Sequence, residues 1–333
     1  MAKVAINGMG RIGRAALKII QEHPELDIVA VNDLMSLDNL VYLLRYDTVY
    51  GRYHHPVDAV GGDLVVKGHH IKFLSEKDPA NLPWKAMGVD IVLECTGIFT
   101  NAEGLKKHLQ AGARYALLSA PPKDKGGEVC CIVHGVTKPE SGVQIMSCAS
   151  CTTNCITPVV EIMGRRIGVK KAIMTTIHAY TSSQAIVDGP NKKFRRGRAG
   201  AANMVPTSTG AAVATTQTMQ QYKGKFDGVA MRVPVPNGSV ADLVFLTERP
   251  TTVEEVNQIF KEEAATTYKG ILGYAEDQIV SSDIIMDPHA SIFDPSMTLV
   301  VDGDLVKVMS WYDNEWGYTN QMIREAARLA KEG

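Results

Sequence analysis

The sequence lacks an excess of charge of either sign, and it lacks any long apolar run. Lys and Arg together number 35, Asp and Glu number 36, and the formal net charge is −1. This balance predicts no global attraction to nucleic acid, so any basic patch has to be local. A membrane-spanning helix needs about 20 consecutive apolar residues, and the sequence holds no such stretch. We therefore expect no association with a membrane.

Cysteine is also scarce, with six residues in a chain of 333. The N-terminal segment MAKVAINGMG has no signal-peptide pattern, because its apolar part is short and is broken at once by Asn and Gly. Disulfides are rare in reducing compartments, so we expect free thiols and a cytoplasmic location. The length suits two domains better than one.

A glycine pattern near the N-terminus is typical of dinucleotide binding. The apolar run KVAIN (3–7) predicts a strand, GMGRIG (8–13) follows it, and helically spaced apolar residues begin at Ile12. In this context Gly8 allows a tight turn, Gly10 lets a pyrophosphate approach the backbone, and Gly13 lets the helix pack on the strand. The alternative is that these are ordinary turn glycines, since the motif by itself is weak.

The following strands strengthen the dinucleotide interpretation. DIVAVND (27–33) ends in Asp33, whose carboxylate would bind a ribose 2′-hydroxyl and repel a 2′-phosphate, which favours NAD over NADP. Further predicted strands at 90–97 and 115–120 flank a predicted helix at about 103–110. Such alternation predicts a doubly wound parallel sheet. The strand ends at Thr96–Gly97 and Ser119 would then line the cofactor crevice.

Three of the cysteines, Cys148, Cys151 and Cys155, fall within SCASCTTNC (147–155). Their spacing is compatible with a metal site, but no fourth ligand with a matching motif is evident. Apolar residues spaced as in a helix follow, so a helix is predicted to begin near Cys151. A thiol at a helix N-terminus has a lowered pKa. We favour Cys151 as a nucleophile, with a metal site or plain core cysteines as alternatives.

The predicted strand at 170–181 contains His178 near its end. A lone histidine there is more often structural, but a cysteine nucleophile needs a base and His178 can supply one. Cysteine, histidine and NAD together indicate oxidation of an aldehyde through a hemithioacetal and a thioester.

A long segment of low periodicity, 179–206, carries five basic residues and then leads to TSTGAA (207–212). Nucleic-acid binding by this loop is conceivable, but no interleaved aromatic residues support it. Hydroxyls and a glycine before an apolar helix suit an anion site instead. The residues that could bind two phosphates are Thr181, Arg196, Thr209, Gly210 and Arg232, although spacing does not establish that they meet.

Taken together, the motifs resemble the phosphorylating glyceraldehyde-3-phosphate dehydrogenase family of the tetrameric, glycolytic type. The resemblance runs the whole length of the chain, and SCASCTTNC combined with WYDNEWGY is highly specific. It implies an α/β fold: a Rossmann-type NAD-binding domain at 1–150, completed by a C-terminal helix at 315–333. It also implies an α+β catalytic domain at 151–314 with a mixed or antiparallel sheet. Residues 179–206 correspond to the family's S-loop, which packs on a neighbouring subunit.

The resemblance also implies roles for individual residues. Cys151 is the nucleophile and His178 its base, and the two form an ion pair. Thr181 and Arg232 hold the C3 phosphate of glyceraldehyde 3-phosphate. The predicted inorganic phosphate site comprises Ser150, Thr152, Arg196, Thr209 and Gly210. The predicted NAD contacts are Gly8, Gly10, Arg11, Ile12, Gly13, Asp33, Lys77, Ser119 and Asn314. No metal is implied, and a homotetramer is expected.

The chain departs from the family at Cys148, where Asn is usual, and in the LMSLDN segment after Asp33, so some use of NADP is compatible with the sequence. Two enzymes remain as rivals. Erythrose-4-phosphate dehydrogenase tends to lose the HAYT and TSTGAA residues that are present here, and a non-phosphorylating aldehyde dehydrogenase would not need phosphate. A binding or regulatory protein with a silent site is the alternative from another class.

Overall fold

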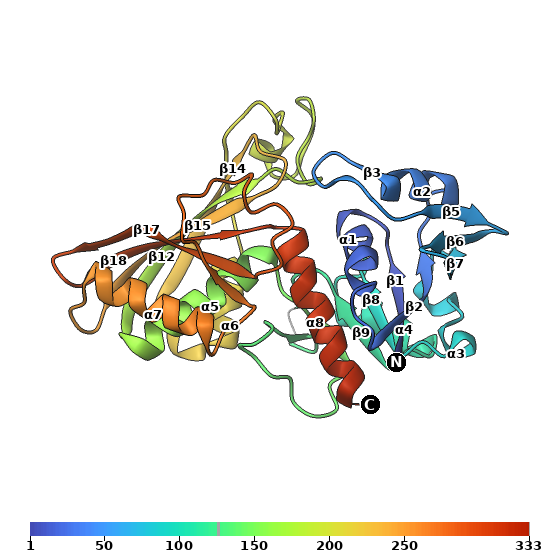
Figure 1. Ribbon diagram of the computed structural model, residues 1–333, viewed down its shortest axis with the longest axis horizontal. Helices are drawn as coiled ribbons and strands as arrows, with labels where there is room; N and C mark the ends of the chain where they lie inside the picture. Colours follow the sequence, from blue (N-terminus) through green and yellow to red (C-terminus); the bar gives the residue numbers. More distant parts are fainter. Residues whose placement is uncertain (125–126, 333) are drawn as a thin grey trace. The chain divides into compact units, whose positions relative to one another are not determined.

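The computed structural model describes residues 1–124 and 127–332, which divide into two compact units (Figure 1). The first unit comprises residues 1–134 and 138–149 together with the chain from Thr319 onward. The second comprises residues 135–137 and 150–318. Gly333, at the end of the predicted C-terminal helix, lies outside the described residues.

The first unit is built on a parallel sheet. Among its described residues nine strands pair in the order β10-β11-β9-β8-β1-β2-β7-β6-β5, and the pairing is parallel from β10 to β7. The strands are β1 (Ala2–Asn7), β2 (Leu26–Asn32), β5 (Val57–Val60), β6 (Asp63–Val66), β7 (His69–Leu74), β8 (Ile91–Glu94), β9 (Tyr115–Leu118), β10 (Cys130–Cys131) and β11 (Ile145–Ser147). A separate short ribbon consists of β3 (Tyr46–Asp47) and β4 (Gly51–Arg52).

Helices connect these strands, as the alternating pattern predicted. They are α1 (Arg11–Ile20), α2 (Leu37–Arg45), α3 (Trp84–Met87) and α4 (Ala102–Gln110), with a 3-10 turn at Pro79–Asn81. The greater part of α8 (Trp316–Glu332), which follows the last strand of the chain, also belongs to this unit. The strand order reverses at β1, which has β2 on one side and β8 on the other. Ligands of such sheets bind beyond the carboxyl ends of the strands at this point. The doubly wound Rossmann-type fold predicted from the sequence is confirmed.

The second unit is built on a mixed sheet, which is also as predicted. Within the described residues seven strands pair in the order β13-β14-β12-β15-β18-β17-β16, and only β14–β12 and β17–β16 are parallel. The strands are β12 (Val169–Ala179), β13 (Val205–Ser208), β14 (Phe226–Val233), β15 (Ser239–Thr247), β16 (Leu272–Tyr274), β17 (Ser291–Val301) and β18 (Leu305–Tyr312).

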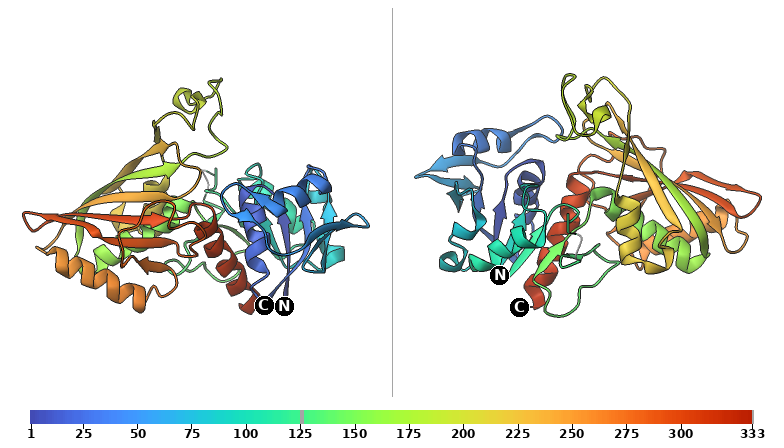
Figure 2. Two further views of the ribbon diagram at one scale, coloured as in Figure 1. Left: turned by 45° about the horizontal axis from the view of Figure 1, so that its top comes forward. Right: turned by 180° about the vertical axis from the view of Figure 1, so that it is seen from behind.

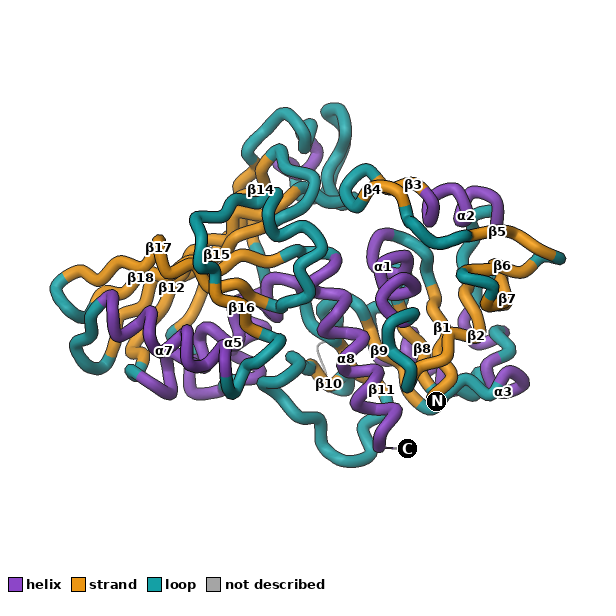
Figure 3. The backbone as a smooth tube through the Cα atoms, in the orientation of Figure 1, coloured by secondary structure: helices purple, strands orange, loops and turns teal. Residues whose placement is uncertain are grey.

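Helices α5 (Cys151–Arg166), α6 (Ala211–Thr218) and α7 (Val253–Ala265) lie on one face of this second sheet (Figure 2). The segment between β12 and β13 is drawn almost entirely as loop in Figure 3, with a 3-10 turn at Phe194–Gly197, in agreement with its low periodicity. A further 3-10 turn occupies Gln220–Tyr222. None of the helices formed by the described residues has the length and apolar character needed to cross a bilayer.

The core of the second unit lies between this sheet and its helices. Phe260 of α7 and Phe293 of β17 are fully buried, and their rings stack with centroids 4.0 Å apart. Because β17 alternates its side chains between two faces, Phe293 points to the helices. The two rings therefore attach α7 to the sheet.

Replacing Phe260 by Ala should lower the free energy of unfolding of the protein by about 3–5 kcal/mol, because the change removes a buried ring and leaves a cavity. Denaturant titration would measure the loss. The control is Gln258→Ala, on the exposed side of the same helix, which should change the free energy of unfolding by no more than about 0.5 kcal/mol. Equal effects of the two substitutions would contradict this packing.

Candidate active site

Four of the predicted cofactor residues line one cavity of the first unit. Gly8, Gly10, Asp33 and Lys77 border a space of about 700 Å³ at the carboxyl ends of β1, β2 and β8. Ser119 follows β9 but does not line this cavity in the described part of the chain. The cavity lies where the strand order reverses, which is the expected position for a dinucleotide.

The glycine turn fits an approaching phosphate. Gly8 has a φ of +97°, and a Cβ atom on it would lie 2.6 Å from the backbone nitrogen of Thr96. A Cβ atom on Gly13 would lie 2.0 Å from the carbonyl oxygen of Gly8, so α1 packs directly on the turn. By contrast, open space surrounds the Cβ position of Gly10.

Helix α1 begins immediately after Gly10, at Arg11 and Ile12, with no side-chain cap and no acidic residue in its first turn. Its uncapped N–H groups and helix dipole favour an anion at this end. The residues present therefore fit the pyrophosphate of a dinucleotide.

Asp33 is held in place by the backbone. Its Oδ2 accepts a hydrogen bond from Met9 N at 2.6 Å and its Oδ1 accepts one from Met35 N at 2.9 Å. A carboxylate has about four acceptor positions, so capacity remains for ribose hydroxyls. The side chain of Arg11 pairs with Asp47, so the contribution predicted for Arg11 is its backbone amide.

In the second unit, helix α5 begins at Cys151, as the sequence predicted. Ser150 is the N-cap, and its hydroxyl accepts a hydrogen bond from Thr153 N at 3.0 Å. The preceding Ala149 has a φ of +56°, a conformation that costs a non-glycine residue energy and that often accompanies functional sites. This turn places the thiol of Cys151 in the first turn of the helix.

Cys151 and His178 are direct neighbours. The Sγ atom of Cys151 lies 3.4 Å from Nε2 of His178, which is the next-to-last residue of β12 and is 3% exposed. On the other side of the ring, Nδ1 lies 2.7 Å from the carbonyl oxygen of Ala179. The same Nδ1 lies 2.5 Å from Nη1 of Arg232, so its two neighbours are a group that only accepts and a group that only donates. Nε2 is the ring nitrogen that faces the thiol.

The charge state of this pair is set by opposing influences. Burial, followed by the charge of Arg232, lowers the pKa of His178 to about 3. Burial raises the pKa of the Cys151 thiol, while Arg232 and hydrogen bonds from Thr152 act to lower it. In the free protein these directions favour a neutral thiol and a neutral imidazole. The ion pair implied by the family resemblance stays a prediction.

Arg232 is brought to His178 by strand pairing. The two residues are partners in the parallel pairing of β12 with β14. Arg232 Nη1 donates to the carbonyl oxygen of Ala179 at 2.9 Å and lies 2.5 Å from His178 Nδ1. The Nε atom of Arg232 is buried and has no hydrogen-bond partner among the described residues. A buried, unpartnered guanidinium N–H next to the nucleophile suits an anionic ligand.

The predicted phosphate residues are connected only in part. Thr181 bonds to Ser183 at 2.8 Å, and Arg196 donates to Ser183 at 3.4 Å and to Thr207 at 3.1 Å. The charge of Arg196 also lowers the pKa of His178, after the larger effects of burial and Arg232. Arg196 therefore belongs to the same neighbourhood.

Thr209 and Gly210 stand at the N-terminus of α6, where Thr209 accepts from Ala211 N at 3.2 Å. In the described chain no hydrogen bond joins them to Arg196 or Cys151. Thr152 is 4% exposed and its hydroxyl bonds to that of Tyr312 at 2.9 Å. That hydroxyl therefore faces the interior of the unit.

Two residues that contact the predicted site, Tyr312 and Ser239, were not predicted from the sequence. The hydroxyl of Tyr312 also bonds to Thr176 at 2.7 Å, and its ring packs edge-on against His178. Ser239 accepts from Ala179 N at 3.1 Å and donates to Asn314 Oδ1 at 2.8 Å. Tyr312 lies within the WYDNEWGY motif at the end of β18, and Ser239 begins β15, so the motif is the signal that could have found Tyr312.

The other cysteines near Cys151 have separate surroundings. Cys155 is buried near Ser291 Oγ, 3.5 Å from its Sγ, and burial raises the pKa of its thiol to about 12. Cys148 is 2% exposed, and burial raises the pKa of its thiol well above the usual value. All six cysteines are free thiols. Among the described residues, no group of three His, Cys, Asp or Glu side chains is arranged to hold a metal ion.

Comparison with known proteins follows the same division of the chain. The family model described as glyceraldehyde 3-phosphate dehydrogenase, NAD binding domain, matches residues 2–102, and the model of the C-terminal domain of the same enzyme matches residues 150–314. The glyceraldehyde-3-phosphate dehydrogenase of Streptomyces coelicolor is 48% identical over 96% of each chain. Proteins of the same name from Zymomonas mobilis and Geobacillus stearothermophilus are 45% and 46% identical over 99% of this chain and 98% and 99% of theirs. These matches confirm the resemblance predicted from the motifs: the chain belongs to the glyceraldehyde 3-phosphate dehydrogenase family.

Proposed function

We propose that this protein is an NAD-dependent, phosphorylating glyceraldehyde-3-phosphate dehydrogenase. It converts D-glyceraldehyde 3-phosphate, inorganic phosphate and NAD into 1,3-bisphosphoglycerate and NADH. The observation that carries the proposal is the pair formed by Cys151 Sγ and His178 Nε2 at 3.4 Å, in a chain of this family. A thiol with an adjacent base is the arrangement required for covalent aldehyde oxidation.

The first step is addition of the Cys151 sulfur to the aldehyde carbon. The thiol proton passes to His178 Nε2 and then to the former carbonyl oxygen, which gives a hemithioacetal. The contacts of Nδ1 with the Ala179 carbonyl and with Arg232 hold the ring so that Nε2 faces the sulfur. Covalent attachment matters because the hydride leaves readily only from a carbon that bears an alkoxide-like oxygen.

The second step removes a hydride from that carbon while His178 Nε2 takes the hydroxyl proton, which leaves a thioester on Cys151. NAD, when bound, would accept the hydride. The α1 N-terminus would hold its pyrophosphate, Asp33 its adenosine ribose and Asn314 its carboxamide. Lys77 and Ser119 would flank the adenine half. Support for Asn314 comes from its Oδ1, which accepts from Gly238 N and from Ser239 and so fixes the side chain.

The third step is attack of a phosphate oxygen on the thioester carbonyl. This gives the acyl phosphate and returns the Cys151 thiolate, so the energy of the oxidation is kept in the product. Arg232 and Thr181 hold the C3 phosphate of the substrate, and the buried Nε–H of Arg232 supports this role. The attacking phosphate binds at Ser150, Thr152, Arg196, Thr209 and Gly210, where the helix dipole at the N-terminus of α6 favours an anion.

NAD rather than NADP is the proposed cofactor, with limited use of NADP. Asp33 is fixed by two backbone amides, and a carboxylate at this position repels a 2′-phosphate. The enzyme is proposed to act in the cytoplasm, where reducing conditions keep the Cys151 thiol free.

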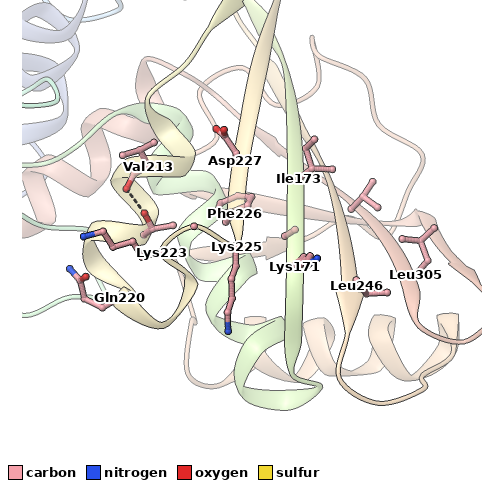
Figure 4. A pocket seen from close by; sticks show the side chains of 14 residues that line it. Lys171, Ile173, Val213, Gln220, Lys223, Lys225, Phe226, Asp227, Leu246 and Leu305 are labelled. Atoms are coloured by element: carbon pink, nitrogen blue, oxygen red, sulfur yellow. Dashed lines mark hydrogen bonds between the residues drawn. The ribbon is translucent and has the colours of Figure 1, made fainter.

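A homotetramer is proposed, and the face of the second sheet opposite its helices supports it. Several apolar side chains there are more than 40% exposed: Ile173, Val229, Val301 and Leu305. Figure 4 shows Ile173, Leu246 and Leu305 of this face beside a cavity of about 760 Å³, which the buried Phe226 and residues of α6 also line. Exposed apolar areas of this kind mark contacts with other chains.

Replacing Cys151 by Ser should lower NADH production from glyceraldehyde 3-phosphate and phosphate at least about a thousandfold, because an alcohol is a poor nucleophile beside this base. The initial rate of NADH formation, followed by absorbance at 340 nm with and without phosphate, measures this loss of activity. The control Cys155→Ser changes a thiol that already lies among serines and should keep most of the activity. Wild-type turnover that does not need phosphate would indicate the non-phosphorylating rival.

Replacing Arg232 by Lys should raise the KM for glyceraldehyde 3-phosphate at least about tenfold and leave the KM for NAD nearly unchanged, because Lys lacks the fixed fork of donors. Steady-state kinetics, with the concentration of each substrate varied in turn, would give the two KM values separately. Arg249→Lys is the control, since Arg249 is exposed and pairs with Glu255. A rise in the KM for NAD alone would remove Arg232 from the substrate site.

Replacing Ile173 by Lys should shift the assembly to smaller species, because a charge placed on the apolar face of the sheet has to be desolvated in an interface. Light scattering coupled to gel filtration gives the mass directly. Val60→Lys, at an apolar position of the first unit that is also exposed to solvent, should leave the mass unchanged. A wild-type protein that runs as a monomer would refute the tetramer.

A further inference from the structure

A buried polar network crosses the carboxyl ends of β1, β2 and β8. None of the three proposed catalytic steps uses it. Glu94 and His108 are fully buried. Oε2 of Glu94 lies 2.6 Å from Asn7 Nδ2 and 3.0 Å from His108 Nε2. Oε1 accepts from Thr96 N at 2.8 Å and also contacts the Thr96 hydroxyl. Among the described residues, neither a lysine nor an arginine forms an ion pair with Glu94.

The direction of each bond on the His108 side follows from Trp84. The indole Nε1–H of Trp84 lies 3.1 Å from His108 Nδ1, and an indole nitrogen can only donate. His108 Nδ1 is therefore an acceptor and carries no proton. The imidazole is consequently neutral with its proton on Nε2, and Nε2–H donates to Glu94.

The bonds on the Asn7 side are fixed by the backbone of Glu76. Glu76 N donates to Asn32 Oδ1 at 2.8 Å, and Glu76 O accepts from Asn32 Nδ2 at 2.9 Å. These two backbone groups determine the orientation of the Asn32 amide. Asn32 Nδ2 then donates to Asn7 Oδ1 at 2.7 Å, which leaves Asn7 Nδ2 to donate to Glu94.

The Thr96 hydroxyl has a fixed role as well. It accepts a hydrogen bond from Ile98 N at 3.0 Å, so its own proton is directed to Glu94. Every group that reaches the carboxyl of Glu94 is thus a donor, four in all. Glu94 is an ionised carboxylate at which two chains of hydrogen bonds end, and donors rather than a cation compensate its charge.

These same residues form the wall of the cofactor cavity. Asn7, Asn32, Glu76 and Thr96 all line it. Thr96 N, which Glu94 holds, is also the atom against which Gly8 packs. We propose that Glu94 is a positioning residue for dinucleotide binding, with His108 as the donor that holds it. The inference rests on the proposed NAD-binding function and adds to it a group that does not touch the cofactor.

The isosteric substitution Glu94→Gln tests this directly. An amide presents an N–H where the carboxylate presented an acceptor, so one N–H must face another. Turning the Asn7 amide round would remove this conflict but create the same conflict with the Asn32 amide. The orientation of the Asn32 amide is fixed by the Glu76 backbone. The disturbance therefore reaches the cavity wall. Leaving a buried donor unsatisfied corresponds to roughly tenfold or more in affinity.

The experiment measures the dissociation constant of NAD by isothermal titration calorimetry for the full-length wild type and three variants. Glu94→Gln and His108→Leu should bind NAD at least about tenfold more weakly. His108→Gln keeps a donor and an acceptor at similar reach and should recover most of the affinity. In steady-state kinetics the loss should fall on the KM for NAD more than on kcat. The alkylation rate of Cys151 by iodoacetamide should stay at the wild-type value in all three, which shows that the second unit is intact.

Wild-type affinity in Glu94→Gln would overturn the inference, as would a loss of kcat without a change in the dissociation constant. If Glu94→Gln does not fold, the comparison of His108→Leu with His108→Gln decides: equal weakening in both overturns the proposal. Failure of the wild type to bind NAD would instead refute the proposed function, so the two failures are distinguishable.

Discussion

The parallel register between β12 and β14 determines the chemistry of the second unit. It sets His178 opposite Arg232, and a shift by one residue would turn each side chain to the other face of the sheet. With the register as it is, both side chains contact the Ala179 carbonyl, and Arg232 Nη1 also lies 2.5 Å from His178 Nδ1. These contacts occupy Nδ1, leave Nε2 facing the thiol and bring a cation within reach of the nucleophile. The base and the anion site are therefore consequences of one pairing.

The electrostatics of the site follow from burial of that arrangement. A thiol at a helix N-terminus is expected to ionise easily, yet burial raises the pKa of Cys151 and lowers that of His178. The helix end and Arg232 oppose the effect of burial on the thiol. The balance depends on what occupies the site, because an anion bound at Arg232 would remove part of the positive charge that stabilises a thiolate. Thiol reactivity should therefore respond to bound phosphate.

Local patterns were sufficient to predict most of the fold. The glycine turn, the start of α5 at Cys151 and the end of β12 next to His178 depend on neighbours within a few residues, which the sequence displays. The contacts of Arg232 with His178 and of Tyr312 with Thr152 join positions 54 and 160 residues apart. No local pattern encodes such distances, so these contacts were either left open or missed. The same holds for Glu94: its strand was predicted, but its partners come from elements that only the sheet topology brings together.

Because of helix α8, the unit that is synthesised first is not the unit that can be completed first. The cofactor-binding unit begins at the N-terminus, yet it includes the chain from Thr319 onward. Met322, Ile323 and Ala326 of that segment are fully buried, and Glu325 bonds to His134 at 2.5 Å. A ribosome adds about 5–20 residues per second, so this unit emerges first but waits for the whole second unit before its own last helix exists. During that interval the surface that α8 covers is exposed to solvent. A chain that terminates prematurely therefore lacks the last helix of the unit that was synthesised first, the cofactor-binding unit.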